Sequence, residues 1–431
     1  MKHRGRHRRQ RRGRALRAFL AGTALALTGA ATMISASQAT VTDDPGALKP
    51  LSAAAADKAR LTEEPVPSAA LDRLAAAMGR PVGVGAVLAD TDRTLRSADD
   101  CAPAERAALP AAPTATRAYC WDPDDTQGWQ PGAVTTSGDA DDDGRWGANR
   151  VILSGWSTAD RTAGADRLAR IAFVDAGDPD RLAYAWVLLV VPVEGGQDYR
   201  PLGSHVSGMV WYQDKLLVTA DDGDRAALYV YDLNRVQRAT VLGAAVGRVP
   251  GGWSAHGERY VLPAVAAYRP AGGTDAPYAA SVSLDRSTTP HSLVAGEWTL
   301  PDGDERARLW RYSFSTLTER SGLLATDAAG RAVPTEAYET KATGVRGVLA
   351  RGDAWYVTRA AGAKERHGTL WRQDEEGARS PTCEPGGSDG HRCWSGRTES
   401  LSYWEETGEV WSQSGRMLFA LELAAIDRSA E

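Results

Sequence analysis

The stretch SGDADDDGRWG, residues 137–147, contains the residue types that begin a calcium loop. Asp139, Asp141 and Asp143 alternate, and a glycine follows them, as in loops whose carboxylates converge on Ca²⁺. In an EF-hand loop a bidentate Glu closes the cage at position twelve, and that position, counted from Asp139, is Arg150 here. Position nine is Gly147, where other calcium loops place an acidic residue. The pattern therefore predicts an acidic turn, with a structural calcium site as the alternative.

A second group of residues has the chemistry of a ligand site: His205, Ser207, Arg346 and Glu399. A cationic and an anionic group around a concave opening orient a polar ligand or a carboxylate. Glu399 and His205 also suit the roles of acid and base in a hydrolase or lyase. The competing interpretation is that Arg346 and Glu399 pair with each other and stabilise the fold.

Nucleophilic catalysis has little support in the sequence. No G-x-S-x-G motif is present, and Ser207 lies too close to His205 in the chain for the two to orient each other without a third partner. Glu405 and Glu406 fall in an expected hairpin turn, where a solvated acidic turn is the simpler interpretation. We therefore assign no catalytic residue from the sequence.

Four cysteines, Cys101, Cys120, Cys383 and Cys393, lie downstream of a leader-like segment. An even number of cysteines in an exported chain predicts disulfides. Proximity favours the pairs Cys101–Cys120 and Cys383–Cys393, although four cysteines allow three pairings. No C-x-x-C spacing supports a zinc site, and no cofactor is expected apart from the calcium alternative.

The first 39 residues have the layout of a secretory signal peptide. Nine basic residues precede an apolar run over residues 18–34, and Ser37-Gln38-Ala39 matches a small-x-small cleavage site. Removing residues 1–39 leaves 41 basic and 55 acidic residues, a net charge of −14. This charge argues against a nucleic-acid partner or an anionic membrane surface. We expect a secreted monomer without a membrane span, because the longest later apolar run, residues 183–193, is too short and suits a buried strand.

The amino-acid composition divides the exported part of the chain into two regions. Residues 40–125 are rich in Ala and Pro and predict a loosely structured extension with one helix. Ser68 is its expected cap, Leu71, Leu74, Ala75 and Met78 share one face, and Gly79 and Pro81 end it. From about Trp129 short runs of Val, Leu, Trp and Tyr alternate with Gly/Asp turns. Residues 126–431 therefore predict a large all-β domain.

A repeat of strand, tight turn and strand supports a β-propeller. HVSGMVWYQDKLLVTAD from His205 aligns with GVRGVLARGDAWYVTRA from Gly344, and weaker copies begin near Gln130, Val249 and Thr398. Because a single unit cannot bury both faces, the copies are expected to stack around an axis as five blades. A sixth blade would fit in residues 263–315, and the last copy and the strand near Ala133 are expected to close the ring together.

The repeat alignment places one set of residues at the start of the innermost strands. The set comprises Pro131, Ser207, Gly251, Arg346 and Glu399, with His205 beside it. Because innermost strands line the central channel, we expect these side chains to meet at one mouth of the ring. The calcium-like stretch would then be an enlarged hairpin turn at the opposite face.

Three motifs resemble a group of uncharacterised secreted proteins from high-GC Gram-positive bacteria: GMVWYQDKLLVTADDGDRAALYVYDL, TESLSYWEETGEVWS and GWQPGAVTT. The resemblance covers residues 119–427. It implies a secreted propeller-like protein and carries no activity or site residue with it.

These observations lead to one functional prediction and two alternatives. We expect a secreted propeller that binds a carbohydrate, a cell-wall component or a protein, and such a site predicts exposed aromatic rings on a concave face. An extracellular hydrolase or lyase acting at the mouth is the second hypothesis. A protein-interaction scaffold, which would need a large apolar patch, is the third.

Overall fold

The computed structural model describes residues 44–159, 167–222, 225–271, 276–299, 306–362, 365–383 and 390–430. These residues lie in one compact unit, Asp44–Glu431. The predicted signal peptide, residues 1–39, lies outside the described residues.

Short antiparallel strands follow one another in sets along the chain. The first set is β6 (Trp129–Thr136), β7 (Val151–Thr158), β8 (Ala169–Asp175) and β9 (Ala183–Val193). The second is β11 (Met209–Tyr212), β12 (Lys215–Asp222), β13 (Arg225–Asp232) and β17 (Tyr260–Pro270). The third is β18 (Ala279–Asp285), β19 (Ser292–Glu297), β20 (Ala307–Ser313) and β22 (Glu336–Thr340). The fourth is β23 (Val345–Arg351), β24 (Ala354–Arg359), β25 (Thr369–Gln373) and β26 (Ala378–Arg379). The fifth is β27 (Ser402–Trp404), β28 (Glu409–Ser414), β29 (Met417–Glu422), β5 (Arg117–Cys120) and β4 (Arg96–Ser97).

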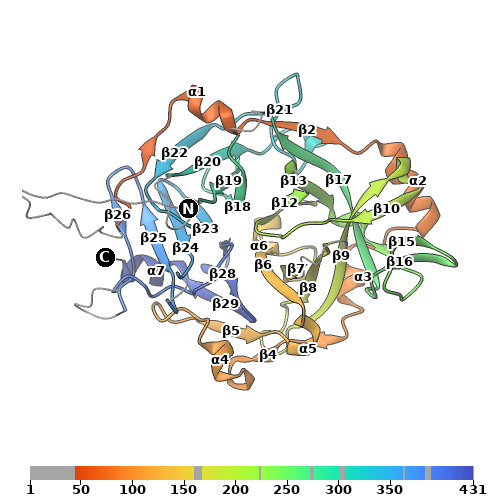
Figure 1. The fold of residues 1–431 in the computed structure, drawn as a ribbon, viewed down its shortest axis with the longest axis horizontal. Coiled ribbons are helices and arrows are strands. Elements are labelled where there is room, and N and C mark those ends of the chain that lie inside the picture. The colour runs from red at the N-terminus through yellow and green to blue at the C-terminus, as the bar shows by residue number, and fades with distance from the viewer. Residues whose placement is uncertain are drawn as a thin grey trace, which may run out of the picture. The chain divides into compact units, whose positions relative to one another are not determined.

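The first strands of these sets lie around a common centre (Figure 1). β6 contacts β11, β11 contacts β18, β18 contacts β23, and β27 contacts β6. Glycines allow this close approach: a Cβ added at Gly132 would lie 1.9 Å from the carbonyl oxygen of Val206, and one at Gly208 would lie 2.8 Å from the nitrogen of Val282. The predicted all-β class with sheets arranged around an axis is confirmed at this level.

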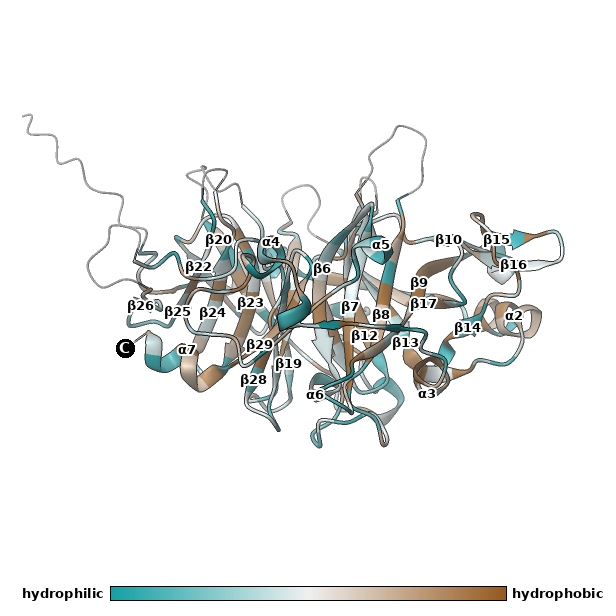
Figure 2. Ribbon diagram, turned by 90° about the horizontal axis from the view of Figure 1, so that it is seen from below, coloured by the Kyte–Doolittle hydropathy of each residue, from teal (hydrophilic) through white to brown (hydrophobic). Residues whose placement is uncertain are grey.

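The hydrophobic core lies between neighbouring sets. Trp156 and Val174 of the first set share a buried cluster with Trp411 and Leu418 of the fifth, and equivalent clusters join the other neighbours. Figure 2 shows hydrophobic residues along the strands and hydrophilic residues in many of the connecting turns. Each set therefore buries both faces against its neighbours, as the stacking argument requires.

The sequence wrongly predicted the N-terminal region to be a loose extension. Residues 44–126 form β1 (Lys49–Pro50), α1 (Ala53–Ala56), β2 (Leu61–Pro65), α2 (Ser68–Met78), α3 (Gly83–Leu88), β3 (Arg93–Thr94), β4, α4 (Pro103–Arg106), β5 and α5 (Pro123–Thr126). This belt runs around the outside of the ring (Figure 1). β1 pairs with β22, β2 with β17, β3 with β9 and β5 with β29. The predicted helix over Ser68–Met78 is confirmed, with Leu71, Leu74 and Met78 buried.

The strand that completes the fifth set is β5, not the strand near Ala133. β5 pairs antiparallel with β29 from Met417↔Cys120 to Ala420↔Arg117. β6, which contains Ala133, begins its own set by pairing with β7. The β-domain therefore begins before residue 126, because residues 117–120 supply one of its strands.

The predicted repeat copy near Gly251 is also wrong. β15 (Val246–Val249) and β16 (Gly252–Ala255) form a separate two-stranded sheet, and the first strand of the third set is β18. The register of β18 shifts between Ala279 and Ser281, as that of β23 does between Val345 and Gly347. Ala280 rather than Gly251 is thus the structural counterpart of Arg346.

The copy near Gln130 is confirmed by the pairing of β6 with β7, and the other three copies share a hydrogen bond. A hydroxyl on the second strand donates to a carbonyl at the start of the first in three sets: Thr219 to Gly208, Thr358 to Gly347 and Ser412 to Ser400. The remaining elements are α6 (Ser137–Ala140), β10 (Asp198–Pro201), β14 (Gln237–Arg238), β21 (Arg331–Ala332) and α7 (Leu423–Ser429).

Both predicted disulfides are present, Cys101–Cys120 and Cys383–Cys393. The first links the segment after β4 to the end of β5. Within the described residues, no helix is both long and apolar enough to cross a bilayer.

Candidate functional site at the mouth of the ring

His205 reaches the mouth because its neighbour Val206 is locked into the ring. Val206 is fully buried, and its carbonyl oxygen accepts a hydrogen bond from the nitrogen of Ala133, at 2.9 Å. Added Cβ atoms at Gly132 and Gly155 would collide with Val206. The backbone around His205 is therefore fixed between β6, β7 and β11.

Arg346 and Glu399 are each held by the buried residues that flank them in sequence. The nitrogen of Gly347 donates to Thr358 Oγ1 at 2.7 Å, which pins the start of β23. Ser400 Oγ accepts from the nitrogen of Val134 at 2.6 Å, which pins the segment before β27 to β6. Each charged residue thus immediately precedes a buried residue whose position is fixed by a hydrogen bond.

These positions bring His205, Glu399 and Arg346 together. Glu399 Oε2 bonds His205 Nε2, and Glu399 Oε1 accepts from Arg346 Nη1 at 3.1 Å. The other imidazole nitrogen of His205, Nδ1, lies 2.7 Å from Ser157 Oγ on β7. We call Ser157, His205, Glu399 and Arg346 the mouth cluster.

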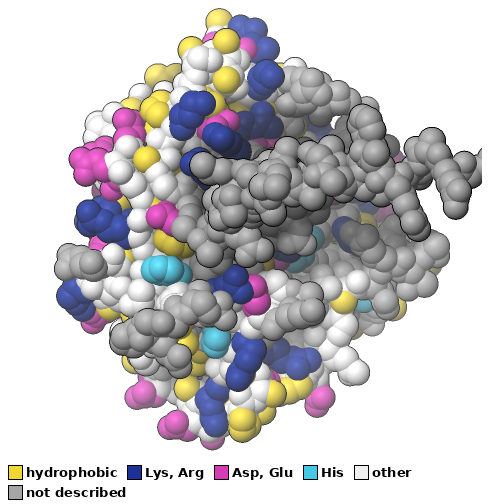
Figure 3. All heavy atoms as spheres, turned by 60° about the vertical axis from the view of Figure 1, so that its left-hand side comes forward, with side chains coloured by type: hydrophobic (Ala, Val, Ile, Leu, Met, Phe, Trp, Pro, Cys, Tyr) yellow, Lys and Arg dark blue, Asp and Glu magenta, His cyan; other side chains and the backbone are white. Residues whose placement is uncertain are grey.

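The members of the mouth cluster differ in their solvent accessibility. The side chains of Arg346, His205 and Glu399 are 38%, 29% and 15% exposed, whereas Ser157 is 2% exposed. A ligand can therefore reach Arg346 and the imidazole of His205. The buried Ser157 orients this imidazole through the hydrogen bond to Nδ1. Figure 3 shows one face of the molecule, on which Lys or Arg side chains and His side chains lie beside one another.

Ser207 lies in a different hydrogen-bonded group. Its Oγ is 3.0 Å from Thr219 Oγ1, and Tyr278, just before β18, bonds both hydroxyls. Burial raises the pKa of Tyr278 well above its usual range, so its phenol stays protonated. The structure thus joins three of the four predicted residues directly and places Ser207 among neutral hydroxyls.

The sequence did not identify Ser157, Tyr278 or Trp298. Trp298, at the end of β19, is 40% exposed, and the Arg346 guanidinium lies 6.0 Å from its ring centroid. Tyr278 and Trp298 flank strands of the third set, which the repeat alignment misplaced. A correct alignment of β18 would have indicated both residues, whereas nothing in the sequence pairs Ser157 with His205.

No known protein family and no curated protein matches this sequence. Among solved structures, a gluconolactonase from Xanthomonas campestris is similar at 12% sequence identity, with a TM-score of 0.25. The alignment covers 77% of this chain and 98% of the gluconolactonase chain. A structural similarity with so low a TM-score carries no information about function.

The acidic stretch after β6 is a turn, as its place in the repeat predicts. Asp139 is buried and accepts hydrogen bonds from Thr135 and Ser402, while Asp141 and Asp143 are exposed and cap backbone nitrogens of the turn. Among the described residues, these three carboxylates do not form a group whose ligand atoms lie within 4.8 Å of one another. The calcium alternative has no preformed cage here and remains a prediction.

Large exposed apolar side chains are few in the described part of the chain: Leu242, Trp298, Leu317 and Val333. They lie in four separate segments. This distribution does not favour a scaffold that docks partners through one large apolar patch.

Proposed function

We propose that this protein is an exported five-bladed β-propeller that binds a carboxylate-bearing ligand at the mouth cluster. The five sets of strands correspond to blades, since each begins with an inner strand and shares a hydrophobic cluster with each neighbour. Two disulfides and the basic-then-apolar leader support export. Acidic glycans and cell-wall fragments are the ligand classes that fit this location.

The convergence of His205, Arg346 and Glu399 carries the proposal. They come from segments that are 141 and 53 residues apart in sequence. Glu399 uses one oxygen for each partner and so fixes both. Within the described residues the hydrogen bond to Glu399 occupies Nη1 of Arg346, which leaves the other guanidinium nitrogens for a ligand carboxylate. Trp298 adds an exposed ring beside the cation.

The hydrogen-bonded chain Ser157–His205–Glu399 favours a hydrolase or lyase as the second candidate. A histidine held at both ring nitrogens has a defined orientation, and an adjacent carboxylate supports acid–base work. The burial of Ser157 argues against its acting as a nucleophile. If the protein is such an enzyme, Arg346 holds the substrate, and His205 and Glu399 exchange protons with it.

Binding of acidic oligosaccharides and cell-wall fragments, measured by calorimetry with the secreted chain, tests the proposal. We expect Arg346→Ala to lower the affinity at least about tenfold, the usual cost of losing a charge-assisted hydrogen bond. Arg351→Ala is the matched control, because Arg351 lies at the other end of the same strand, where its guanidinium lies 3.7 Å from Glu405 and 5.3 Å from the ring centroid of Tyr403. Equal affinities for the two variants would refute the mouth as the site. Mass spectrometry of the mixtures separates the candidates, since turnover that His205→Ala abolishes indicates an enzyme.

A further inference from the structure

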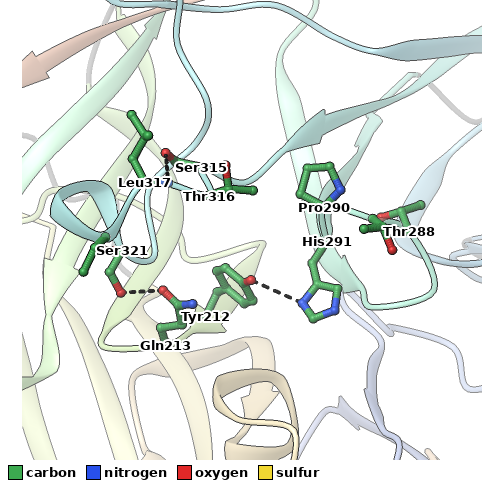
Figure 4. Close-up of a pocket in the computed structure, with 11 residues that line it drawn as sticks. Tyr212, Gln213, Thr288, Pro290, His291, Ser315, Thr316, Leu317 and Ser321 are labelled. Atoms are coloured by element: carbon green, nitrogen blue, oxygen red, sulfur yellow. Dashed lines mark hydrogen bonds between the residues drawn. The ribbon is translucent and has the colours of Figure 1, made fainter.

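A pocket lies at the face opposite the mouth, between the second and third sets (Figure 4). It has a volume of about 390 Å³ and is formed by the β11–β12 turn, the β18–β19 loop and the segment after β20. A second cavity of about 380 Å³ shares Tyr212, Gln213, His291 and Ser321 with it and extends toward Trp146 and Asp214. The two cavities together form a groove, and each is of a size that accommodates a small molecule.

The polar groups of this groove are held in place before any ligand arrives. The hydroxyl of Tyr212 lies 3.2 Å from His291 Nδ1, and its ring packs 4.0 Å from that of Phe314. Ser321 donates a hydrogen bond to the amide oxygen of Gln213, as Figure 4 shows. Gln213 has φ of 52° in the left-handed region, which costs free energy for a residue with a side chain.

The pocket of Figure 4 is polar but carries no charge. Its lining contains hydroxyl and amide side chains and no Asp, Glu, Lys or Arg: Gln213, Thr288, Thr289, Ser315, Thr316, Thr318 and Ser321. Burial and the nearby Arg286 lower the pKa of His291, so its imidazole is neutral at pH 7. Fixed neutral donors and acceptors suit a ligand that hydrogen-bonds extensively without an ionic group.

The adjoining cavity adds an aromatic ring and charged side chains that pair with one another or with a neighbour: Arg286 with Asp142, and Asp214 with Lys215. Asp214 Oδ1 is buried and has no hydrogen-bond partner among the described residues, while Oδ2 accepts from Lys215. Trp146 is half-buried in the wall and packs on Trp211 with ring centroids 5.3 Å apart. Because Oδ1 is enclosed by protein, a ligand in this cavity contacts the Trp146 ring and the neutral polar groups rather than this carboxylate oxygen.

We propose that this groove binds a neutral oligosaccharide, with one sugar unit in each cavity. Sugar hydroxyls would exchange hydrogen bonds with Gln213, His291 and Thr316, and the rings of Tyr212 and Trp146 would contact the apolar faces of the sugars. The site is independent of the mouth cluster, which lies at the opposite ends of β11 and β18.

Calorimetry with short neutral oligosaccharides of glucan, xylan and mannan, beside their uronic-acid counterparts, tests this site. Gln213→Gly removes the amide at a backbone conformation that glycine prefers, so the variant should fold and bind neutral oligosaccharides about tenfold more weakly. Arg346→Ala should bind them as the wild type does, which separates this site from the mouth. If Gln213→Gly melts below the wild type, Thr316→Ala, at an exposed position, replaces it. Failure of every neutral oligosaccharide to bind, equal binding by wild type and groove variants, tighter binding of uronic acids than of neutral oligosaccharides by Arg346→Ala, or loss of neutral binding in Arg346→Ala would each overturn the proposal.

Discussion

Asp139 links two sets of strands through one buried carboxyl group. Its Oδ2 accepts from Thr135 Oγ1 at 2.6 Å and from Ser402 Oγ at 2.8 Å, so it joins β6 to β27. Burial raises the pKa of Asp139 from its ordinary 3.8 to about 6, even though these hydroxyls and Arg286 favour the ionised form. Residue 139, which the sequence offered as a calcium ligand, is thus a structural group that titrates above the usual range for Asp.

We expect the stability of the protein to fall between about pH 4 and pH 6 through this group. The folded chain holds the proton of Asp139 more tightly than the unfolded chain does, so raising the pH favours unfolding until both forms are ionised. Asp139→Asn removes this titration. As the pH rises, the unfolding free energy of the wild type should therefore fall by roughly 3 kcal/mol relative to that of the variant. Urea unfolding at pH 4 and pH 7 measures the shift. Asp143→Asn, in the exposed part of the same turn, should leave the pH dependence unchanged, and parallel curves for Asp139→Asn would contradict the assignment.

At the scale of the elements, close approach between neighbouring sets depends on glycine. Gly132 on β6 packs against the backbone of Val206, and Gly208 before β11 packs against Val282 on β18. Because the opposing atoms belong largely to backbone, they cannot move away as a flexible side chain can. The same contacts fix Val206 and therefore the position of His205 at the mouth.

Gly132→Ala should destabilise the ring by about 3 kcal/mol or more, since the new Cβ would lie 1.9 Å from a carbonyl oxygen. Gly85→Ala is the control: Gly85 lies in α3, and a Cβ there meets no atom within 4 Å. That substitution should be neutral or stabilise the helix by about 0.5–1 kcal/mol. Thermal and urea unfolding of both variants measure these effects, and similar stabilities for the two would contradict the packing argument.

Across the whole molecule, the N-terminal belt crosses every set of strands. The nitrogen of Leu48 donates to the carbonyl of Asp374 beside the fourth set, and the belt then pairs in turn with the third, second, first and fifth sets. Its last strand, β5, lies beside β29 near the C-terminus of the chain. The belt therefore closes the ring and ties its outer edges together.

A chain that begins at residue 126, the boundary expected from the sequence, should fail to fold into a soluble monomer. It lacks β5, so β29 would expose its edge, and it lacks the partners of β9, β17 and β22. A chain that begins at Asp44 retains the belt and should unfold cooperatively. Size-exclusion chromatography and circular dichroism compare the two, and a stable monomer from residue 126 would show that the belt is dispensable.

Much of the fold was predictable because it depends on local patterns. The helix over Ser68–Met78 follows from apolar spacing, and the inner strands at Met209, Val345 and Ser402 follow from the repeat. The third set was missed because its first strand has Ser281 where the first, second and fourth sets have Gly132, Gly208 and Gly347. The belt was missed because its strands are short and take their order from partners far away in sequence.

The sequence by itself determined the class of fold and most of the repeat, favoured both cysteine pairings and indicated three members of the mouth cluster. Tertiary structure alone decided that Ser157 orients His205, that Glu399 joins His205 to Arg346, and that Tyr212 and His291 face a groove. The physical reason is the range of the interactions. Apolar periodicity and turn residues act within a few positions of the chain, whereas hydrogen bonds between sets depend on how the sheets pack around the centre.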